Sequence, residues 1–265
     1  HAHCIRPYSH SLSDDERLYK STAERAREAT RDPIDLLYQR LLDEGHATDA
    51  DLRELQRRLD LEVQAAADDA LEQAAPPTDS IFDHLYSPHI DITGDAFASQ
   101  PNFRGEPRTM VDSINLTLHE EMARNPNVLV FGEDVADCSR EENLPLVKGK
   151  GGVFKTTQGL QTKYGSRRCF NTPIAEAVIT GRAIGLATRG LKPVAEIQFF
   201  DYIWPAMMQI RDEMATLRWR SNGAWGCPAV LRVAIGGYLT GGAVYHSQNG
   251  ESIFTHIPGL RVVFP

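Results

Sequence analysis

A chain of 265 residues is long enough for one large domain or two smaller ones. Charged residues make up 24% and hydrophobic residues 42%, the balance of an ordinary soluble globular protein. The formal net charge of −8 argues against non-specific binding to nucleic acid, which needs a basic surface.

The cysteines and the longest apolar run bear on the compartment of the protein. The four cysteines lie far apart without a CxxC pair, which predicts reduced thiols and a cytoplasmic location. The longest uncharged run, 233–250, is rich in glycine and contains polar side chains, so no membrane span is predicted. The sequence starts without Met and stops on an expected strand, and we expect a fragment cut at both ends.

The N-terminal part is expected to be irregular over 1–31 and helical after that. Asp32 and Pro33 begin a predicted helix that ends at Gly45, and Thr48 begins a longer one. The longer helix carries a single apolar stripe at Leu52, Leu55, Leu59, Val63, Ala66 and Ala70. The pair predicts a helical hairpin that packs on another element, because one stripe cannot bury itself. Residues 1–75 thus form one part, and the Pro-, Asp- and Ser-containing segment 76–108 is a predicted linker.

From Thr109 to the end, predicted helices and strands alternate. Short Val/Ile runs separated by helices predict a doubly wound, mostly parallel α/β sheet over 109–265. In such sheets ligands bind beyond the carboxyl ends of the strands, where Glu133, Asp134 and Gln198 are expected. The expected elements are helix 110–124, strand 128–134, helix 156–164, strand 168–170, helix 173–188, strand 193–199, helix 204–220, strand 228–234, helix 250–256 and strand 261–264.

Glu176 stands near the start of a helix that otherwise looks made for burial. Asn171 or Thr172 would cap this helix, Pro173 suits its first position, and apolar side chains follow nearly all round. No cation stands at helical-neighbour spacing from Glu176. The carboxylate is therefore either a first-turn acid favoured by the helix dipole or the partner of a group from elsewhere, such as a ligand donor.

Two histidines are further candidates for chemistry. His246 follows the glycine-rich "GGYLTGG" and is either an exposed loop residue or a proton donor. His10 and Ser11 lie in "SHSLSDDERLY", which is read either as an acidic solvated loop or as part of a site. A Ser-His-Asp hydrolase is not supported, since no GxSxG motif is present. We assign no metal ligands within this sequence.

Several long motifs together resemble a known family. Five stretches are similar to the pyrimidine-binding domain in the β subunit of a thiamine-diphosphate-dependent dehydrogenase. This dehydrogenase is a component of 2-oxo acid dehydrogenase complexes, especially the branched-chain type. The stretches are "VFGEDV", "GGVFKTTQGLQTKYG", "FNTPIAEAVITGRAIG", "AEIQFFDYIWPAMMQI" and "YHSQNGESIFTHIPGLRVVFP". Residues 1–75 resemble the C-terminal end of the α subunit. The resemblance implies a fused αβ chain whose Mg²⁺ and pyrophosphate motif would precede His1.

The resemblance also implies roles for individual residues. Glu176 would hydrogen-bond a ring nitrogen of the cofactor's aminopyrimidine, and Tyr202 would stack on that ring. The other cofactor-binding residues would be Glu133, Ile174 and Gln198. His246 would donate a proton during acyl transfer to lipoyl, and His10 would stand near the thiazolium. Ser11 matches a position that is phosphorylated in some relatives.

The implied activity is oxidative decarboxylation of a branched-chain 2-oxo acid, with transfer of the acyl group to a lipoyl domain. Implied partners are the acyltransferase component that carries this domain and further copies of the fused chain; nucleic acid and membrane are not expected. The alternatives are a pyruvate dehydrogenase, a transketolase-like enzyme or a non-catalytic assembly subunit. One departure from the family is the segment 137–152, which is longer than usual.

Overall fold

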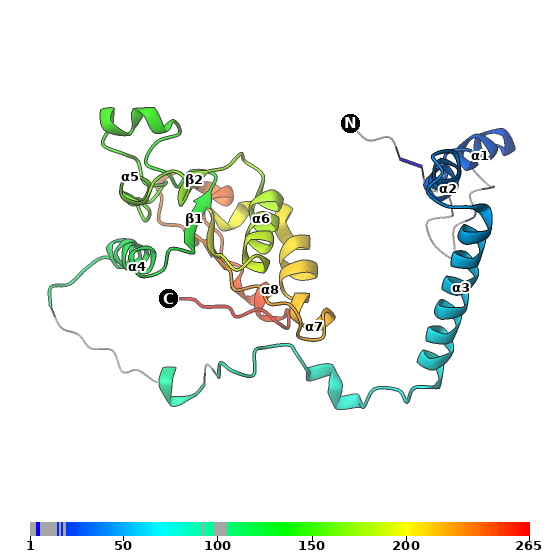
Figure 1. Ribbon diagram of the computed structural model, residues 1–265. Coiled ribbons are helices and arrows are strands. Elements are labelled where there is room, and N and C mark those ends of the chain that lie inside the picture. The colour runs from blue at the N-terminus through cyan, green and yellow to red at the C-terminus, as the bar shows by residue number, and fades with distance from the viewer. Residues whose placement is uncertain (1–3, 6–14, 16, 18–19, 92, 98–104) are drawn as a thin grey trace. The chain divides into compact units, whose positions relative to one another are not determined.

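The computed structural model describes residues 4–5, 15, 17, 20–91, 93–97 and 105–265. The chain forms two compact units, His1–Pro77 and Thr78–Pro265 (Figure 1). Each unit is described by itself below.

The described residues of the first unit form three α-helices, α1 (Thr22–Ala29), α2 (Pro33–Asp43) and α3 (Asp49–Glu72). The predicted caps begin α2 and α3: the Asp32 carboxylate accepts from the Ile34 N–H at 2.8 Å, and Thr48 forms a capping box with Asp51. The expectation of irregular structure up to residue 31 was wrong. The Ser21 hydroxyl caps α1 by accepting from the Glu24 N–H, and residues of good helix propensity follow it.

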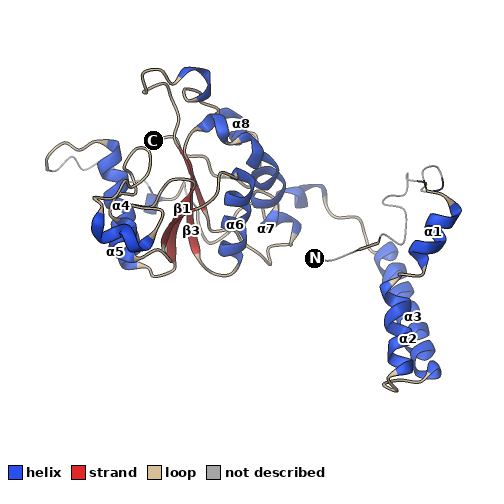
Figure 2. Ribbon diagram, turned by 90° about the horizontal axis from the view of Figure 1, so that it is seen from above, coloured by secondary structure: helices blue, strands red, loops and turns tan. Residues whose placement is uncertain are grey.

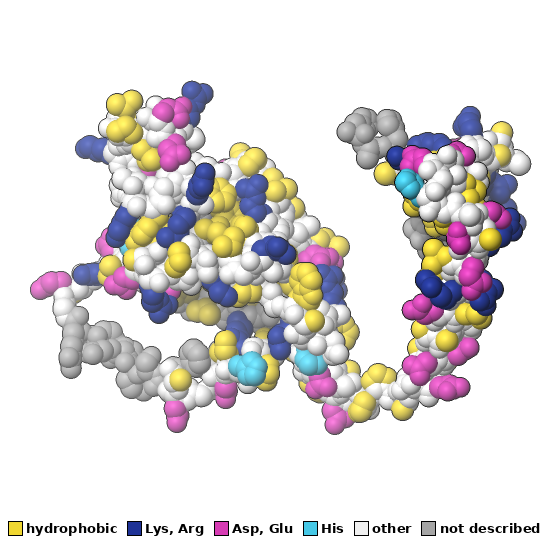
Figure 3. Space-filling view, in the orientation of Figure 1, with side chains coloured by type: hydrophobic (Ala, Val, Ile, Leu, Met, Phe, Trp, Pro, Cys, Tyr) yellow, Lys and Arg dark blue, Asp and Glu magenta, His cyan; other side chains and the backbone are white. Residues whose placement is uncertain are grey.

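The apolar stripe of α3 stays largely exposed within this unit. Leu52 is the buried member, whereas Leu55, Leu59 and Val63 are all exposed. Figure 3 shows apolar side chains between acidic and basic ones on this surface. The α2–α3 pair therefore leaves most of its apolar stripe free to contact another element.

The second unit is built on a four-stranded parallel sheet. Its strands are β1 (Val128–Gly132), β2 (Cys169–Asn171), β3 (Lys192–Ile197) and β4 (Val230–Val233), in the order β2-β1-β3-β4. All three pairings are parallel, so the carboxyl ends of the strands meet at one edge. The predicted α/β fold with a parallel sheet is confirmed.

Helices cover both faces of the sheet (Figure 2). One side carries α4 (Met110–Arg124) and α5 (Leu160–Tyr164), and the other carries α6 (Glu176–Thr188) and α7 (Leu217–Arg220). Alternation along β1 builds both layers: Val128 and Val130 pack with Met122 of α4, whereas Leu129 and Phe131 pack with α6. A further short helix of this unit is α8 (Glu251–Thr255).

Two predicted elements in the C-terminal third were wrong. The helix expected over 204–220 is divided into a 3₁₀ turn Trp204–Ala206, a π-helix Gln209–Met214 and α7. Pro205 lacks an N–H to continue a helix before it, and the π-helix holds one extra residue per turn. The strand expected over 261–264 pairs with no strand of the described residues, and Val263 is exposed.

Helix α6 also differs from its prediction. It begins at Glu176 rather than at Pro173, because the Thr172 N–H donates to the Gly132 carbonyl at 2.6 Å and holds the preceding segment as a loop. The helix is not buried all round: Ile179, Thr180, Ala183 and Ala187 are buried, whereas Val178 is 56% exposed. In this chain α6 is thus half-covered, with an open outer face.

Candidate functional site

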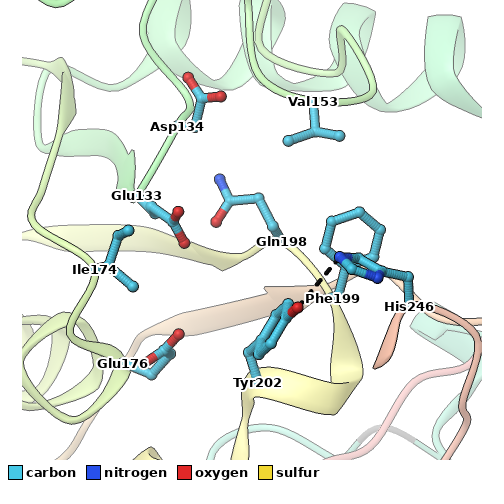
Figure 4. Close-up of a pocket in the computed structure, with 9 residues that line it drawn as sticks. All are labelled: Glu133, Asp134, Val153, Ile174, Glu176, Gln198, Phe199, Tyr202 and His246. Atoms are coloured by element: carbon cyan, nitrogen blue, oxygen red, sulfur yellow. Dashed lines mark hydrogen bonds between the residues drawn. The ribbon is translucent and has the colours of Figure 1, made fainter. Parts of the chain in front are cut away.

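A pocket of about 320 Å³ lies beyond the carboxyl ends of β1 and β3, which is where ligands bind in open parallel sheets. The pocket takes residues from five separate segments of the chain (Figure 4). Six predicted site residues of the β-like part meet here. The lining residues are Glu133, Asp134, Val153, Ile174, Glu176, Gln198, Phe199, Tyr202 and His246.

The loop after β1 places Glu133 and Asp134 at the pocket. Gly132 allows this turn, because a Cβ there would lie 2.4 Å from the Glu196 carbonyl oxygen on β3. The Asn171 side-chain oxygen accepts from the backbone N–H groups of Val135 and Ala136 at 2.8 and 2.7 Å. These contacts tie the loop to the end of β2.

Glu176 is the first residue of α6 and reaches the same pocket. In the part of the chain that the structure describes, its carboxylate has neither a hydrogen-bond partner nor an ion-pair partner. Burial of the Glu133 carboxyl and, second, the charge of Glu176 raise the pKa of Glu133 above its usual range. Burial and the negative charges of Glu176 and Asp134 in the same pocket therefore favour the uncharged form of Glu133.

Gln198 follows β3 directly and is 5% exposed. Neither its amide oxygen nor its amide nitrogen has a hydrogen-bond partner among the described residues. Figure 4 shows this amide pointing into the pocket. Because a buried polar group without a partner costs about 1–3 kcal/mol, the amide is suited to a ligand that both donates and accepts.

Tyr202 and His246 meet on the other side of the pocket (Figure 4). The Tyr202 hydroxyl lies 3.2 Å from Nε2 of His246, and Nδ1 of His246 lies 3.1 Å from the Gly242 carbonyl oxygen. Tyr202 ends a 3₁₀ turn, Phe200–Tyr202, and His246 follows another, Ala243–Tyr245. Phe199 packs edge-on against His246 with ring centroids 4.5 Å apart.

The long segment 137–152 closes onto the pocket by an ion pair. Lys150 pairs with the carboxylate of Asp134, and its backbone N–H donates to the Asp137 carbonyl at 2.8 Å. Gly151 and Gly152 take left-handed backbone conformations here, with φ of 66° and 83°. The segment thereby brings Val153 into the lining.

Two predicted site residues cannot be placed in this pocket, and two residues that line it were not predicted. His10 and Ser11 fall outside the described residues. Val153 and Phe199 were not predicted to line the site; Phe199 adjoins Gln198 at the strand end, a signal that would have found it, whereas Val153 carries none. Among the described residues, no group of three or more His, Cys, Asp or Glu side chains is arranged to hold a metal ion.

The parallel sheet and the polar pocket at its carboxyl edge define a ligand-binding α/β domain. More specifically, residues 106–265 match the family described as "Transketolase, pyrimidine binding domain", and because this match spans more than half of the chain, the chain belongs to that family. Residues 1–79 match a second family, "Dehydrogenase E1 component". The predicted resemblance is confirmed on both parts.

Curated relatives are similar over about three fifths of the chain. The chain is 47% identical over 155 residues to "2-oxoisovalerate dehydrogenase subunit beta" of Bacillus subtilis, covering 58% of this chain and 43% of the relative. It is 43% identical over 157 residues to "3-methyl-2-oxobutanoate dehydrogenase subunit beta" of Mycobacterium tuberculosis, covering 59% of this chain and 41% of the relative. It is 42% identical over 168 residues to "Pyruvate dehydrogenase E1 component subunit beta" of Leifsonia xyli, covering 63% of this chain and 46% of the relative.

The chain thus spans less than half the length of these relatives. Within the described ranges, no helix combines the length and the apolar character that a membrane crossing needs. The family implies dependence on thiamine diphosphate, and its relatives are subunits of larger assemblies.

Proposed function

We propose that this chain is part of a fused 2-oxo acid dehydrogenase that decarboxylates a branched-chain 2-oxo acid and passes the acyl group to a lipoyl arm. The two family matches support the fusion, because the dehydrogenase E1 match precedes the pyrimidine-binding match on one chain. The printed names of two relatives support the substrate class, since 2-oxoisovalerate and 3-methyl-2-oxobutanoate are branched-chain 2-oxo acids.

The observation that carries the proposal is the set of unpaired polar groups in the pocket. The Gln198 amide has no partner, and the Glu176 carboxylate faces the same pocket without one. An aminopyrimidine ring offers ring nitrogens, an amino group and two apolar faces. It would pair with these groups while its faces contact Ile174 and the Tyr202 ring. The residues present therefore fit this half of thiamine diphosphate.

When bound, thiamine diphosphate supplies the electron sink for decarboxylation; the chain supplies orientation and proton handling. Glu176 would hold a proton at a ring nitrogen, Tyr202 would stack on the ring, and Glu133 and Ile174 would shape the pocket around it. His246 would donate a proton during acyl transfer, and His10 is assigned to the thiazolium side.

The remaining assignments concern the whole protein. Mg²⁺ would be bound with the pyrophosphate by the α-like part, and no residue of this pocket is assigned to it. The partners would be the lipoyl domain of an acyltransferase component and other copies of the fused chain. A cytoplasmic location rests on the cysteine spacing, and Cys138, Cys169 and Cys227 are free thiols in the structure.

The test is decarboxylation by the full-length protein with thiamine diphosphate and Mg²⁺. We expect turnover of 3-methyl-2-oxobutanoate with an artificial electron acceptor, and loss of turnover in Glu176→Ala. Glu120→Gln is the matched control, because Glu120 lies on the exposed side of α4. Absence of turnover with every 2-oxo acid, with binding of the cofactor retained, would favour the assembly role.

A second candidate substrate is pyruvate, because one relative at 42% identity is named as a pyruvate dehydrogenase subunit. The ratio of kcat/KM for 3-methyl-2-oxobutanoate to that for pyruvate decides between them. We expect the branched substrate to be preferred, and a ratio below one would assign pyruvate instead.

A further inference from the structure

A short hydrogen-bonded chain runs from Gly242 through His246 to Tyr202. The Gly242 carbonyl oxygen can only accept, so Nδ1 of His246 carries a proton and donates to it at 3.1 Å. In a neutral imidazole with Nδ1 protonated, Nε2 is the acceptor. The Tyr202 hydroxyl, 3.2 Å away, therefore donates to Nε2.

The imidazole is held in this orientation by its surroundings. Its ring is nearly perpendicular to Phe199 (88°) and to Tyr202 (80°), with centroids 4.5 and 5.5 Å away. A Cβ at Gly242 would lie 3.2 Å from the His246 Cβ, so glycine lets the loop close behind the ring. Nε2 of His246, the nitrogen on the pocket side, thus already has a hydrogen-bond partner, the Tyr202 hydroxyl.

We propose that Tyr202 is the group through which His246 exchanges a proton with the pocket. When His246 is protonated on both nitrogens, Nε2–H donates to the Tyr202 oxygen, and the hydroxyl hydrogen is turned toward the pocket. In the transfer, the Nε2–H bond breaks as the Tyr202 oxygen gains that proton, and the original hydroxyl proton leaves to the acceptor. His246 ends neutral with Nδ1–H, and Tyr202 ends with its hydroxyl restored.

The identity of the acceptor rests on the proposed function. During acyl transfer the decarboxylated substrate supplies the electron pair that opens the lipoyl S–S bond. One sulfur bonds the acyl carbon and the other leaves as a thiolate, which needs one proton. The Tyr202 hydroxyl supplies that proton, and protonated His246 replaces it. Tyr202 therefore has a second role besides stacking on the pyrimidine ring, and the two roles separate in Tyr202→Phe, which keeps the ring and removes the hydroxyl.

The first test examines the hydrogen bond without any reaction. The full-length protein is labelled with ¹⁵N in its histidine rings, and His246→Gln identifies the signals of His246. At a pH where the ring is neutral, we expect a protonated Nδ1 and an unprotonated Nε2. In Tyr202→Phe the Nε2 signal should move toward that of a nitrogen without a hydrogen bond. A protonated Nε2 in the wild type, or an unmoved signal in Tyr202→Phe, would overturn the proposal.

Tyr245→Phe is the matched control, because Tyr245 is 66% exposed and adjoins His246 in sequence. It should leave the Nε2 signal in place. A shift equal to that of Tyr202→Phe would mean that the loop, rather than the Tyr202 hydroxyl, sets the signal.

The second test measures decarboxylation and lipoyl acylation separately. Tyr202→Phe should lower the rate of acylation of a lipoyl domain roughly 10-fold or more, and by a larger factor than it lowers decarboxylation with an artificial acceptor. In a His246→Gln background the same change should lower the acylation rate no further, because His246 acts through Tyr202 and the loss of either residue breaks the relay. A full loss in that background would overturn the relay. If the wild type decarboxylates no 2-oxo acid, the proposed function fails, while the ¹⁵N signals still decide the arrangement of Tyr202 and His246.

Discussion

The carboxyl group of Glu133 is buried in the pocket that Glu176 also lines, and the burial and the charge of Glu176 together raise the pKa of Glu133. Burial of Glu133 is the larger cause, and the charge of Glu176 is the second; Lys150 acts in the opposite direction. Two like charges facing one cavity are costly unless a proton or a hydrogen-bond donor lies between them. The pair therefore favours a ligand that brings donors.

The first prediction concerns Glu133 and pH. The pKa of Glu133 in the folded chain is raised above the ordinary 4.5. At a pH between the ordinary and the raised pKa, the folded chain therefore keeps a proton on Glu133 that the unfolded chain has lost. This stabilising contribution is present below the unfolded pKa and is lost as pH rises through the folded pKa. Glu133→Gln should therefore gain stability relative to wild type as the pH rises above the ordinary pKa of 4.5, measured by urea unfolding. A difference that stays constant with pH would contradict it; Glu120→Gln is the control.

The second prediction concerns Glu176. Glu176→Gln should slow proton exchange at the thiazolium carbon of bound thiamine diphosphate roughly 10²–10⁴-fold, because it removes the carboxylate that we propose handles the proton. Stability should change by less than about 0.5 kcal/mol, since this carboxylate has no partner in the described chain. Deuterium exchange into the cofactor measures the first and urea unfolding the second. Exchange at the wild-type rate would exclude the assigned role.

The third prediction concerns a buried ion pair beside the site. Arg232 on β4 pairs with Glu196 on β3, which is 1% exposed, and it also donates to the Thr156 hydroxyl at 2.8 Å. Arg232→Met leaves a buried carboxylate unpaired and should cost about 3–5 kcal/mol of unfolding free energy. Adding Glu196→Gln should recover part of that loss, since the unpaired charge is gone.

Arg124 provides the control for this pair. It pairs with Glu121 on the surface of α4, where its side chain is 73% exposed. Arg124→Met should cost no more than about 1 kcal/mol in the same urea titration. Equal losses from Arg124→Met and Arg232→Met would show that burial of the Arg232–Glu196 pair has no energetic consequence.

The fourth prediction concerns Gly132, the last residue of β1. Gly132→Ala would place a Cβ 2.4 Å from a backbone oxygen of β3, which must then move, at about 1–3 kcal/mol. Gly226→Ala is the matched control, because no atom lies within 4 Å of a Cβ built there. Thermal unfolding should show a lower Tm for Gly132→Ala than for Gly226→Ala. An unchanged Tm in Gly132→Ala would mean that β1 and β3 move apart without loss of stability.

The sheet was largely predictable because its strands are short apolar runs between helices. The wrong predictions of helix and strand bounds arose where tertiary contacts, rather than local sequence preference, decide the structure. Pro173 suits the first turn of a helix, but the hydrogen bond from Thr172 to Gly132 delays the start of α6. The run at 261–264 has strand composition, yet strand formation needs a pairing partner, which local composition does not reveal.

The site was predictable in part for the same reason. The rule for the carboxyl ends of parallel strands grouped Glu133 with Gln198, and the lack of a helical partner singled out Glu176. The contact between Tyr202 and His246 spans 44 residues and depends on two loops, so no spacing rule anticipates it. Val153 reaches the pocket through the folding of 137–152, which the sequence left open.

One backbone runs through both compact units, joined after Pro77. Each completed chain carries one copy of each unit, so their ratio is fixed at synthesis and does not depend on the balanced expression of two genes. Any contact between them is governed by the effective concentration that the connecting segment sets, and not by the amount of protein in the cell. Dilution, which separates two independent subunits, leaves such a pair together.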